Sequence, residues 1–193
     1  MGRETQRLGK RGEYTVLSKL LDLGLDIYEP IVDVENIDCI VRTPQGEYNE
    51  VQVKTRTKKE KGGEIFQIGW FKPRPNFFVV LYIPESDESW VLPSKVFFEN
   101  RVKTKYLEDR NLMRLILSQK KKEELHPFRD AFHLLKTQKK ELHKEIERSG
   151  WEALKKTYPS SKAVEERLKQ GNMTENYKNV LIRLKRYWEK RSS

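Results

Sequence analysis

The stretch "NEVQVKTR", Asn49 to Arg56, decides how the rest of the chain is interpreted. Apolar and polar residues alternate in it, as they do in a β-strand with one buried face. The two valines point to one side of such a strand, and Glu50, Gln52 and Lys54 point to the other. A solvated outer face accounts for this row of a carboxylate, an amide and an ammonium group. A site that holds a metal ion and a phosphate accounts for it more specifically.

The segments around this strand predict a sheet with helical cover. Turn sequences rich in Gly, Pro and Asn separate runs of β-forming residues. The predicted strands are residues 26–32, 37–43, 47–57, 64–71, 77–84 and 89–97. The run Phe77 to Ile83 is apolar on both faces, which is typical of a central strand in a covered sheet. We therefore expect an α/β fold in which short antiparallel hairpins lie beside a buried strand.

Before these strands, a helix is predicted over residues 6–23, and Gly24 supplies a stop. Its apolar positions recur at helical spacing and are Leu8, Val16, Leu17, Leu20 and Leu21. Gly9 and Gly12 form no phosphate-binding loop, because no strand precedes them and no Gly-Lys-Ser/Thr follows. We expect these glycines to let the helix lie close to the sheet.

The second half of the chain is mostly helical by its periodicity. One further strand is predicted over Asn111 to Leu117. Helices are predicted near residues 118–125, 128–136, 138–149, 151–157, 161–170 and 175–190. The last helix carries an apolar stripe, and most of its basic residues fall off that stripe. The predicted organisation is one domain over residues 1–136 and a basic helical region over residues 137–193.

Composition limits the classes of function. The 193 residues carry a net charge of +10, and this charge is placed unevenly. Residues 1–100 have 14 Lys and Arg against 16 Asp and Glu, whereas residues 101–193 have 25 against 13. A basic excess in one half predicts a nucleic-acid partner, although solubility alone explains a modest excess. No apolar run suits a membrane span and the single Cys39 excludes an internal disulfide, so we expect a soluble, cytoplasmic protein without a membrane partner.

Two carboxylates stand in apolar surroundings before the opening stretch. On a helix, Glu13 lies within about 40° of Leu17 and about 20° of Leu20, so its carboxylate is on the apolar stripe and needs a partner. Asp38 stands in the run "IDCIV", where aspartate is a poor strand former. Two plainer explanations stay open. Glu13 ends the stripe at a solvated edge or pairs with a base such as Arg56, and Asp38 closes the preceding turn.

An antiparallel return after the turn at "PQG" carries Gln52 and Lys54 back past Asp38. Asp38 and Gln52 then offer a carboxylate and an amide oxygen to one divalent cation, and hard cations such as Mg²⁺ accept oxygen ligands. The ammonium of Lys54 faces the same place, where it orients an attacking water or stabilises charge on a phosphate.

In their order and spacing, these segments resemble the motifs of the PD-(D/E)XK nucleases. The segments are "LGKRGEYTVLSKLL", "IDCIV" and "EVQVKTR". The sequence is most similar to the branch whose third motif is Gln-x-Lys, which includes intron-type homing endonucleases, and the likeness covers roughly residues 5–135. The resemblance implies a restriction-endonuclease-like core, in which helices flank a central mixed sheet. Here a helical, basic C-terminal extension follows that core.

The resemblance also implies roles for five residues. Asp38 and Gln52 look like metal ligands, with the backbone carbonyl of Val53 as a third. Lys54 looks like the catalytic lysine, and Glu13 looks like the helix-borne acid that holds water at the metal. The implied cofactor is Mg²⁺ or Mn²⁺.

The sequence departs from the family pattern at two positions. Ile37 stands where the family has proline before the aspartate. Gln52 stands where the third motif has Asp or Glu, which removes a negative charge and weakens the expected affinity for metal. Glu50 shares the face of Gln52 and is a possible source of the missing charge, at a displacement of about 6–7 Å along the strand.

The segment after the motif, "KTRTKKEKGG", predicts a basic hairpin beside the site. The candidates for contacts with DNA phosphates are Arg56, Lys58, Lys59 and Lys61. Such contacts position a duplex without reading its sequence. A solvated, flexible turn is the plainer explanation. The expected partner is double-stranded DNA, and a homodimer is attractive because cutting both strands of a duplex needs two sites.

The sequence thus predicts a Mg²⁺- or Mn²⁺-dependent DNA endonuclease that hydrolyses phosphodiester bonds through metal-activated water. Three alternatives stay open. A structure-selective, junction-resolvase-like nuclease would prefer branched DNA to any linear sequence. A catalytically inactive, nuclease-like DNA-binding protein is the alternative that Gln52 keeps open. A protein–protein scaffold built on the C-terminal helices would have no affinity for nucleic acid.

Overall fold

The computed structural model describes residues 3–32, 36–56, 59–60, 62–136, 151–152, 154–171 and 175–192. The chain divides into two compact units, Met1–His143 (unit 1) and Lys144–Ser193 (unit 2). The predicted helix over residues 138–149 lies outside the described residues, as does the stretch that follows the expected domain boundary after residue 136. That boundary stays a prediction.

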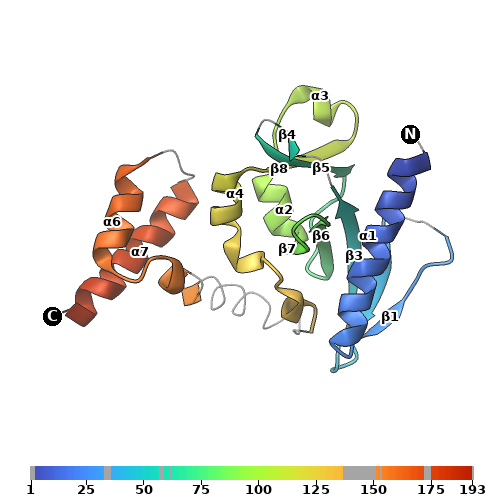
Figure 1. The fold of residues 1–193 in the computed structure, drawn as a ribbon, viewed down its shortest axis with the longest axis horizontal. Helices are drawn as coiled ribbons and strands as arrows, with labels where there is room; N and C mark the ends of the chain where they lie inside the picture. The colour runs from blue at the N-terminus through green and yellow to red at the C-terminus, as the bar shows by residue number, and fades with distance from the viewer. Residues whose placement is uncertain are drawn as a thin grey trace. The chain divides into compact units, whose positions relative to one another are not determined.

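Unit 1 combines helices with two β-sheets (Figure 1). In chain order its elements are α1 (Arg3–Asp22), β1 (Asp26–Tyr28), β2 (Cys39–Arg42), β3 (Tyr48–Thr55), β4 (Lys59–Glu60), β5 (Gly63–Gly69), β6 (Phe77–Ile83), β7 (Glu88–Pro93), α2 (Ser94–Asn100), α3 (Lys105–Glu108), β8 (Leu112–Leu117), α4 (Gln119–Glu124), and the 3₁₀ helices η1 (His126–Phe128) and η2 (Phe132–Lys136). Unit 2 includes helical residues 151–152 and 154–157, α6 (Ser161–Lys169) and α7 (Glu175–Ser192). Of the described helices, none combines the length and the apolar character that a membrane crossing needs.

The larger sheet is mixed and has the strand order β1-β2-β3-β6-β7. β2 and β3 form an antiparallel hairpin, β3 and β6 run parallel, and β6 and β7 are antiparallel. Figure 1 shows α1 on one side of this sheet and α2 on the other. The expected fold class is confirmed: helices flank a central mixed sheet, and a helical segment follows at the C-terminal end.

The strand β6 is an interior strand of the larger sheet and is covered on both faces, as predicted. All of its residues, Phe77 to Ile83, are buried. β3 and β7 pair with its two edges, and helices lie on both sides of the sheet (Figure 1). A strand in this position needs apolar side chains on both faces, which is why its sequence shows no polar alternation.

Helix α1 packs on β3 through a glycine. A Cβ atom at Gly12 would lie 1.9 Å from Oγ1 of Thr55, so only glycine allows this approach without movement of the strand or the helix. No atom lies within 4 Å of the corresponding position at Gly9. The expectation that both glycines bring the helix to the sheet is therefore right for Gly12 and wrong for Gly9. Leu21, expected on the apolar stripe, is 60% exposed, so that assignment is wrong as well.

The segment predicted as a strand over residues 89–97 changes structure at Pro93. β7 ends there, and Ser94 begins helix α2. Proline has no N–H for a further ladder bond and is tolerated at a helix start. The hydroxyl of Ser94 donates to the carbonyl of Arg74 at 2.6 Å and accepts from its N–H at 3.0 Å, which fixes the start of α2. The strand prediction for residues 94–97 is therefore wrong.

Two 3₁₀ helices, η1 and η2, replace the continuous helix predicted over residues 128–136. They are separated at Asp130, whose φ is +50°. The N–H of Asp130 donates to the carbonyl of Ser89 at 2.7 Å, and its carboxylate accepts from the N–H of Ser89 at 2.9 Å. These bonds tie the segment to β7 and interrupt the helix, so tertiary structure overrides local helical preference here.

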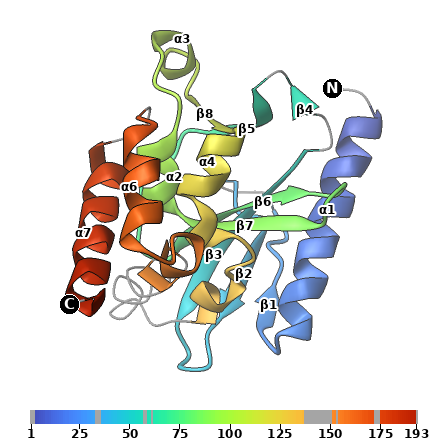
Figure 2. The same ribbon diagram turned by 60° about the vertical axis from the view of Figure 1, so that its left-hand side comes forward.

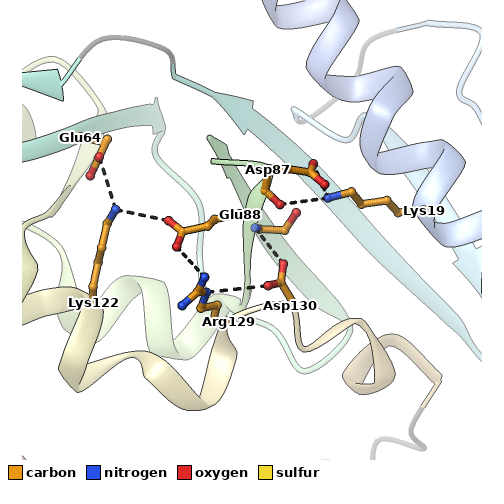
Figure 3. A network of polar contacts seen from close by, with 8 residues as sticks. Lys19, Glu64, Asp87, Glu88, Lys122, Arg129 and Asp130 are labelled. Atoms are coloured by element: carbon orange, nitrogen blue, oxygen red, sulfur yellow. Dashed lines mark hydrogen bonds and ion pairs between the residues drawn. The ribbon is translucent and has the colours of Figure 1, made fainter. Parts of the chain in front are cut away.

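A second sheet, with the order β4-β5-β8, is not predicted by the sequence pattern. A network of ion pairs joins it to the larger sheet (Figure 3). The ammonium of Lys122 on α4 lies 3.4 Å from a carboxylate oxygen of Glu64 on β5 and 3.4 Å from one of Glu88 on β7. Glu88 also pairs with Arg129 at 2.7 Å. Because Glu64 is 6% exposed, its carboxylate needs this cation in place of water.

Unit 2 has an apolar core of its own. The buried members of this core are Leu154, Tyr158, Val164, Leu181 and Leu184. Figure 1 and Figure 2 show α6 and α7 side by side, and Lys185 on α7 reaches Glu165 on α6 at 3.6 Å. The indole N–H of Trp188 donates to the carbonyl of Tyr158 at 2.8 Å, which ties α7 to the preceding segment.

Substitution of the two glycines of α1 separates close packing from helix propensity. We expect Gly12→Ala to lower the free energy of unfolding by about 1–3 kcal/mol, because the added methyl group overlaps Thr55. We expect Gly9→Ala to raise it by up to about 1 kcal/mol, because alanine favours the helix and meets no neighbouring atom. Urea unfolding measures both changes, and equal effects in the two variants would contradict the packing of α1 on β3.

Removal of Lys122 tests the network between the sheets. We expect Lys122→Ala to lower the free energy of unfolding by about 3 kcal/mol, because two largely buried carboxylates lose their shared cation. Lys95→Ala is the matched control: the Lys95 side chain is 76% exposed, and such a surface pair changes stability by about 0.5 kcal/mol or less. If the two variants unfold at the same urea concentration, the network does not hold the sheets together.

Candidate functional site

The candidate site lies where β3 continues beyond its partner β2. The hairpin pairing ends at Cys39 and Val51, and β3 runs on to Thr55. The N–H of Asp38 donates to the carbonyl of Val51 at 2.9 Å and closes the pairing. The carboxylate of Asp38 then accepts from the N–H of Val53 at 2.6 Å, so a side chain takes the place of a strand. One edge of β3 is thereby left open beside Asp38.

The backbone of Val53 faces the same edge. Every second residue of β3 turns its N–H and C=O groups toward β6. Arg56, which directly follows β3, continues this series, because its N–H donates to the carbonyl of Tyr82 at 3.0 Å. Val53 belongs to the alternate series of residues, whose backbone groups point away from β6, because its N–H donates to Asp38. In an extended strand the N–H and C=O of one residue point to the same side. The carbonyl of Val53, predicted as a metal ligand, therefore points toward the edge that carries Asp38.

A pocket of about 550 Å³ opens at this edge. The predicted site residues that line it are Glu13 from α1, Asp38 before β2, Val53 and Lys54 from β3, and Arg56 just after β3. On β3, the side chain of Thr55 meets α1, and by alternation that of Lys54 lies on the other face. The pocket thus wraps around the open edge of the strand and brings together residues from a helix and two strand ends.

Among the predicted catalytic and metal-binding residues, Gln52 is the one that does not line the pocket. It is 1% exposed, and its Oε1 atom is buried without a hydrogen-bond partner among the described residues. An amide oxygen in this state is unfavourable by about 1–3 kcal/mol relative to one that is hydrogen-bonded. The atom is therefore an acceptor that a cation or a water molecule would satisfy.

The carboxylate of Glu13 is paired on its own helix. The ammonium of Lys10 lies 2.8 Å from Oε2 of Glu13, and the Glu13 side chain is 20% exposed. The hydrogen bond to Glu13 raises the pKa of Lys10 above its ordinary value. Arg56, the base expected as an alternative partner, donates its Nε–H to the carbonyl of Ile65 at 2.7 Å. The plainer expectation of a base beside Glu13 is thus right, with Lys10 as that base.

Lys54 brings an ammonium group to the pocket. The residue is half-buried, and no hydrogen bond or ion pair holds its ammonium within the part of the chain that the structure describes. A cation that lines a pocket without an internal partner is suited to an anionic ligand such as a phosphate.

Glu50 does not supply the charge that Gln52 lacks. Its carboxylate accepts from Nε of Arg74 at 2.6 Å and from the amide of Asn76 at 3.3 Å. Glu50 is also absent from the lining of the pocket. Glu50 therefore adds no negative charge to the pocket.

The basic segment after β3 is described in part. β4 and β5 pair antiparallel, so the backbone forms a hairpin there, and Lys59 belongs to β4. Lys58 and Lys61 lie outside the described residues. The contacts of these lysines and of Arg56 with DNA stay predictions.

Sequence reasoning missed several residues of the pocket lining, among them Lys10, Glu29 and Gln67. Lys10 stands three residues before Glu13, a helical spacing that signals a possible ion pair. Glu29 follows β1 in "DIYEP", where nothing distinguishes it from a solvated turn residue. Gln67 comes from β5 in the second sheet, which local sequence does not place near β3.

Carboxylates concentrate negative charge around the start of β2. Burial raises the pKa of Cys39 to about 12, and the charges of Asp38, Glu29 and Glu13 act in the same direction. Burial is the larger cause of the raised pKa, and the three carboxylates add to it because negative charge disfavours a thiolate. The same negative charge attracts cations.

The donor atoms near Asp38 fit a hard cation. Among the described residues, no three His, Cys, Asp or Glu side chains are grouped closely enough to hold a metal ion. A cation here would rely on the carboxylate of Asp38 and the carbonyl of Val53, whereas the unpartnered amide oxygen of Gln52 lies outside the lining of the pocket. Oxygen donors of these kinds suit Mg²⁺ or Mn²⁺ with several retained waters. The residues therefore fit such an ion, with low affinity expected from the single charge.

Comparison with solved structures supports the fold. A bacterial homing endonuclease, I-Ssp6803I, is similar to this chain with a TM-score of 0.53 and 20% sequence identity, over 70% of this chain and 94% of that one. No protein-family model and no curated protein matches the chain. The similarity shows a nuclease-like fold, whereas membership of the Gln-x-Lys branch stays a prediction.

The thiol of Cys39 tests the environment at the start of β2. Its pKa is about 12 in the folded protein and about 9 in an unfolded chain, so the stability it contributes is present below pH 9 and is lost as the pH rises toward 12. We expect no reaction of the folded protein with a thiol-specific disulfide reagent at about pH 8, and full reaction in denaturant. Reaction of the folded protein at the rate of a free cysteine would contradict this environment.

Proposed function

We propose that this chain is a DNA endonuclease that hydrolyses phosphodiester bonds with the help of Mg²⁺ or Mn²⁺. One observation carries the proposal: Glu13, Asp38 and Lys54 come from three separate segments and line one pocket at the open edge of β3. The nuclease-like fold supports it, because the similar solved structure is that of a homing endonuclease. The net charge of +10 supports a polyanionic substrate.

Each pocket side chain has a part in the proposed reaction. The ammonium of Lys54 lies beside the scissile phosphate, where it orients the attacking water and stabilises the negative charge that develops. The carboxylate of Glu13 accepts a hydrogen bond from that water, and Lys10 holds this carboxylate in place. The guanidinium group of Arg56 contacts a neighbouring phosphate and positions the strand.

Asp38 is the residue on which metal binding depends in this proposal. The N–H of Val53 orients its carboxylate, and the oxygens of Gln52 and Val53 complete the set of protein ligands. Bound there, Mg²⁺ or Mn²⁺ supplies a Lewis acid for the phosphate and lowers the pKa of a water molecule. The proposed substrate is a duplex, and a homodimer would provide the two sites that cutting both strands requires.

A nuclease-like DNA-binding protein without catalysis is the second candidate. The observation that favours it is the donor set, because the described residues include no group of three His, Cys, Asp or Glu side chains fit to hold a metal. Gln52 in place of a carboxylate agrees with that alternative.

Cleavage assays with purified protein separate the two candidates. The substrates are supercoiled plasmid, linear duplex and a four-way junction, each with Mg²⁺ or Mn²⁺. We expect Lys54→Ala and Asp38→Asn each to slow cleavage by at least about 100-fold, the usual effect of losing one group that stabilises developing charge or holds the metal. Lys103→Ala removes an exposed lysine of the same unit and is expected to cleave like the wild type. Preference for the junction would identify a structure-selective nuclease.

Each contrary result has a distinct meaning. Cleavage that persists in both Lys54→Ala and Asp38→Asn would indicate a contaminating nuclease and contradict the proposal. DNA binding without cleavage in any sample would favour the inactive binding protein, and no affinity for DNA would favour the scaffold. A Gln52→Glu variant that cleaves at lower metal concentration than the wild type would support Gln52 as a ligand.

A further inference from the structure

Helix α7 carries a basic face that the candidate site does not use. One side of the helix exposes Asn179, Arg183, Arg186 and Lys190, and these four residues are called the α7 stripe. Their spacing is i, i+4, i+7 and i+11, so on an ideal helix the four side chains lie within an arc of about 60°. The stripe extends along about 16 Å of helix at 1.5 Å per residue.

The opposite face of α7 is fixed by the core of unit 2. Leu181 and Leu184 are fully buried, and Tyr187 and Trp188 pack against the same core. The indole N–H of Trp188 donates to the carbonyl of Tyr158 at 2.8 Å. A helix held in this way presents its outer face at a defined rotation, which a surface that reads another molecule requires.

The ion pairs described on α7 involve Lys185 and do not neutralise the positive charges of Arg183 and Arg186. On the flank of α7, Lys185 pairs with Glu165 at 3.6 Å and with Glu189 at 3.7 Å. For Arg183 and Arg186, in contrast, the described part of the chain provides neither an ion pair nor a hydrogen bond. Two exposed guanidinium groups one turn apart create a positive surface that a polyanion neutralises.

We propose that α7 is a DNA-reading helix whose stripe enters the major groove of a duplex. This groove is about 12 Å wide and admits an α-helix. The residue types match base edges, since arginine donates two hydrogen bonds to O6 and N7 of guanine and asparagine pairs with N6 and N7 of adenine. Lys190, at the far end of the stripe, suits a phosphate.

This inference deepens the proposed function and rests on it for the duplex as substrate. The phosphate contacts expected from Lys54 and Arg56 position DNA but carry no sequence information. The homing endonuclease structure is matched over 94% of its length by 70% of this chain, a share close to that of unit 1. In this proposal unit 2 is an addition to the nuclease-like core, and a reading helix there would give the core a preferred site.

Selection from a pool of randomised duplexes, with the full chain in EDTA, tests the reading helix without requiring cleavage. We expect the wild type to enrich a short motif. We expect Arg183→Ala/Arg186→Ala to lose that motif and to bind the selected duplex at least about tenfold more weakly. Lys156→Ala/Lys162→Ala removes equal charge from exposed positions elsewhere in unit 2, and we expect it to lose less than about threefold.

A charge-preserving pair separates base reading from electrostatic attraction. Arg183→Lys/Arg186→Lys keeps both positive charges but loses the planar fork that bonds two atoms of guanine. We expect the dependence of affinity on salt to match that of the wild type within about 0.5 in the log–log slope, while the motif disappears. If the lysine pair enriches the same motif as the wild type, the arginines do not read bases.

The remaining outcomes are also decisive. A wild-type selection without a motif overturns the reading helix, and so does equal affinity for single-stranded DNA or for RNA of any sequence. A protein that enriches a motif but never cleaves DNA refutes the nuclease and supports the reading helix. A protein whose cleavage depends on Lys54 but that selects no motif refutes the reading helix and supports the nuclease. Thermal unfolding that matches the wild type verifies that the variants are folded.

Discussion

The hydrogen bond from the N–H of Val53 to the carboxylate of Asp38 is the interaction on which the candidate site depends. It satisfies a backbone donor of β3 beyond the end of β2, so the edge of the sheet stays open without a buried, unpaired N–H group. The same bond orients the carboxylate of Asp38, and the carbonyl of Val53 points to the same edge. A continued strand in place of Asp38 would satisfy the backbone equally well and would fill the pocket.

The surroundings of this edge are held by contacts that are far apart in sequence. Gly12 lets α1 approach Thr55 closely, and this approach brings Glu13 to the pocket. The second sheet borders the pocket through Gln67, and Lys122 links that sheet to the larger one through two carboxylates. The side chains of the pocket thus come from elements that pack on one another, as chemistry with positioned groups requires.

The candidate site was partly predictable, and each failure has a physical reason. Glu13 and Asp38 stand out because a carboxylate in an apolar pattern needs a partner. Gln52 was expected at the pocket, and the structure buries it without placing it in the lining. Strand alternation assigns a side chain to a face of the sheet but does not say whether that face is covered. Lys10 could have been found from its helical spacing to Glu13. The place of Gln67 in the pocket depends on the pairing of β5 with β8, which no local sequence pattern predicts.

The sequence by itself determined the central strand, the hairpin of β2 and β3, the first helix and the basic last helix, because periodicity and turn residues act over a few neighbouring positions. Tertiary structure alone decided that a helix begins at Ser94, that Asp130 interrupts another, and that a second sheet stands beside the first. Tertiary structure also decided which face of α7 is exposed, because the core of unit 2 covers the opposite face. Burial is a property of the packed chain, and only packing reveals which polar groups are left for a ligand.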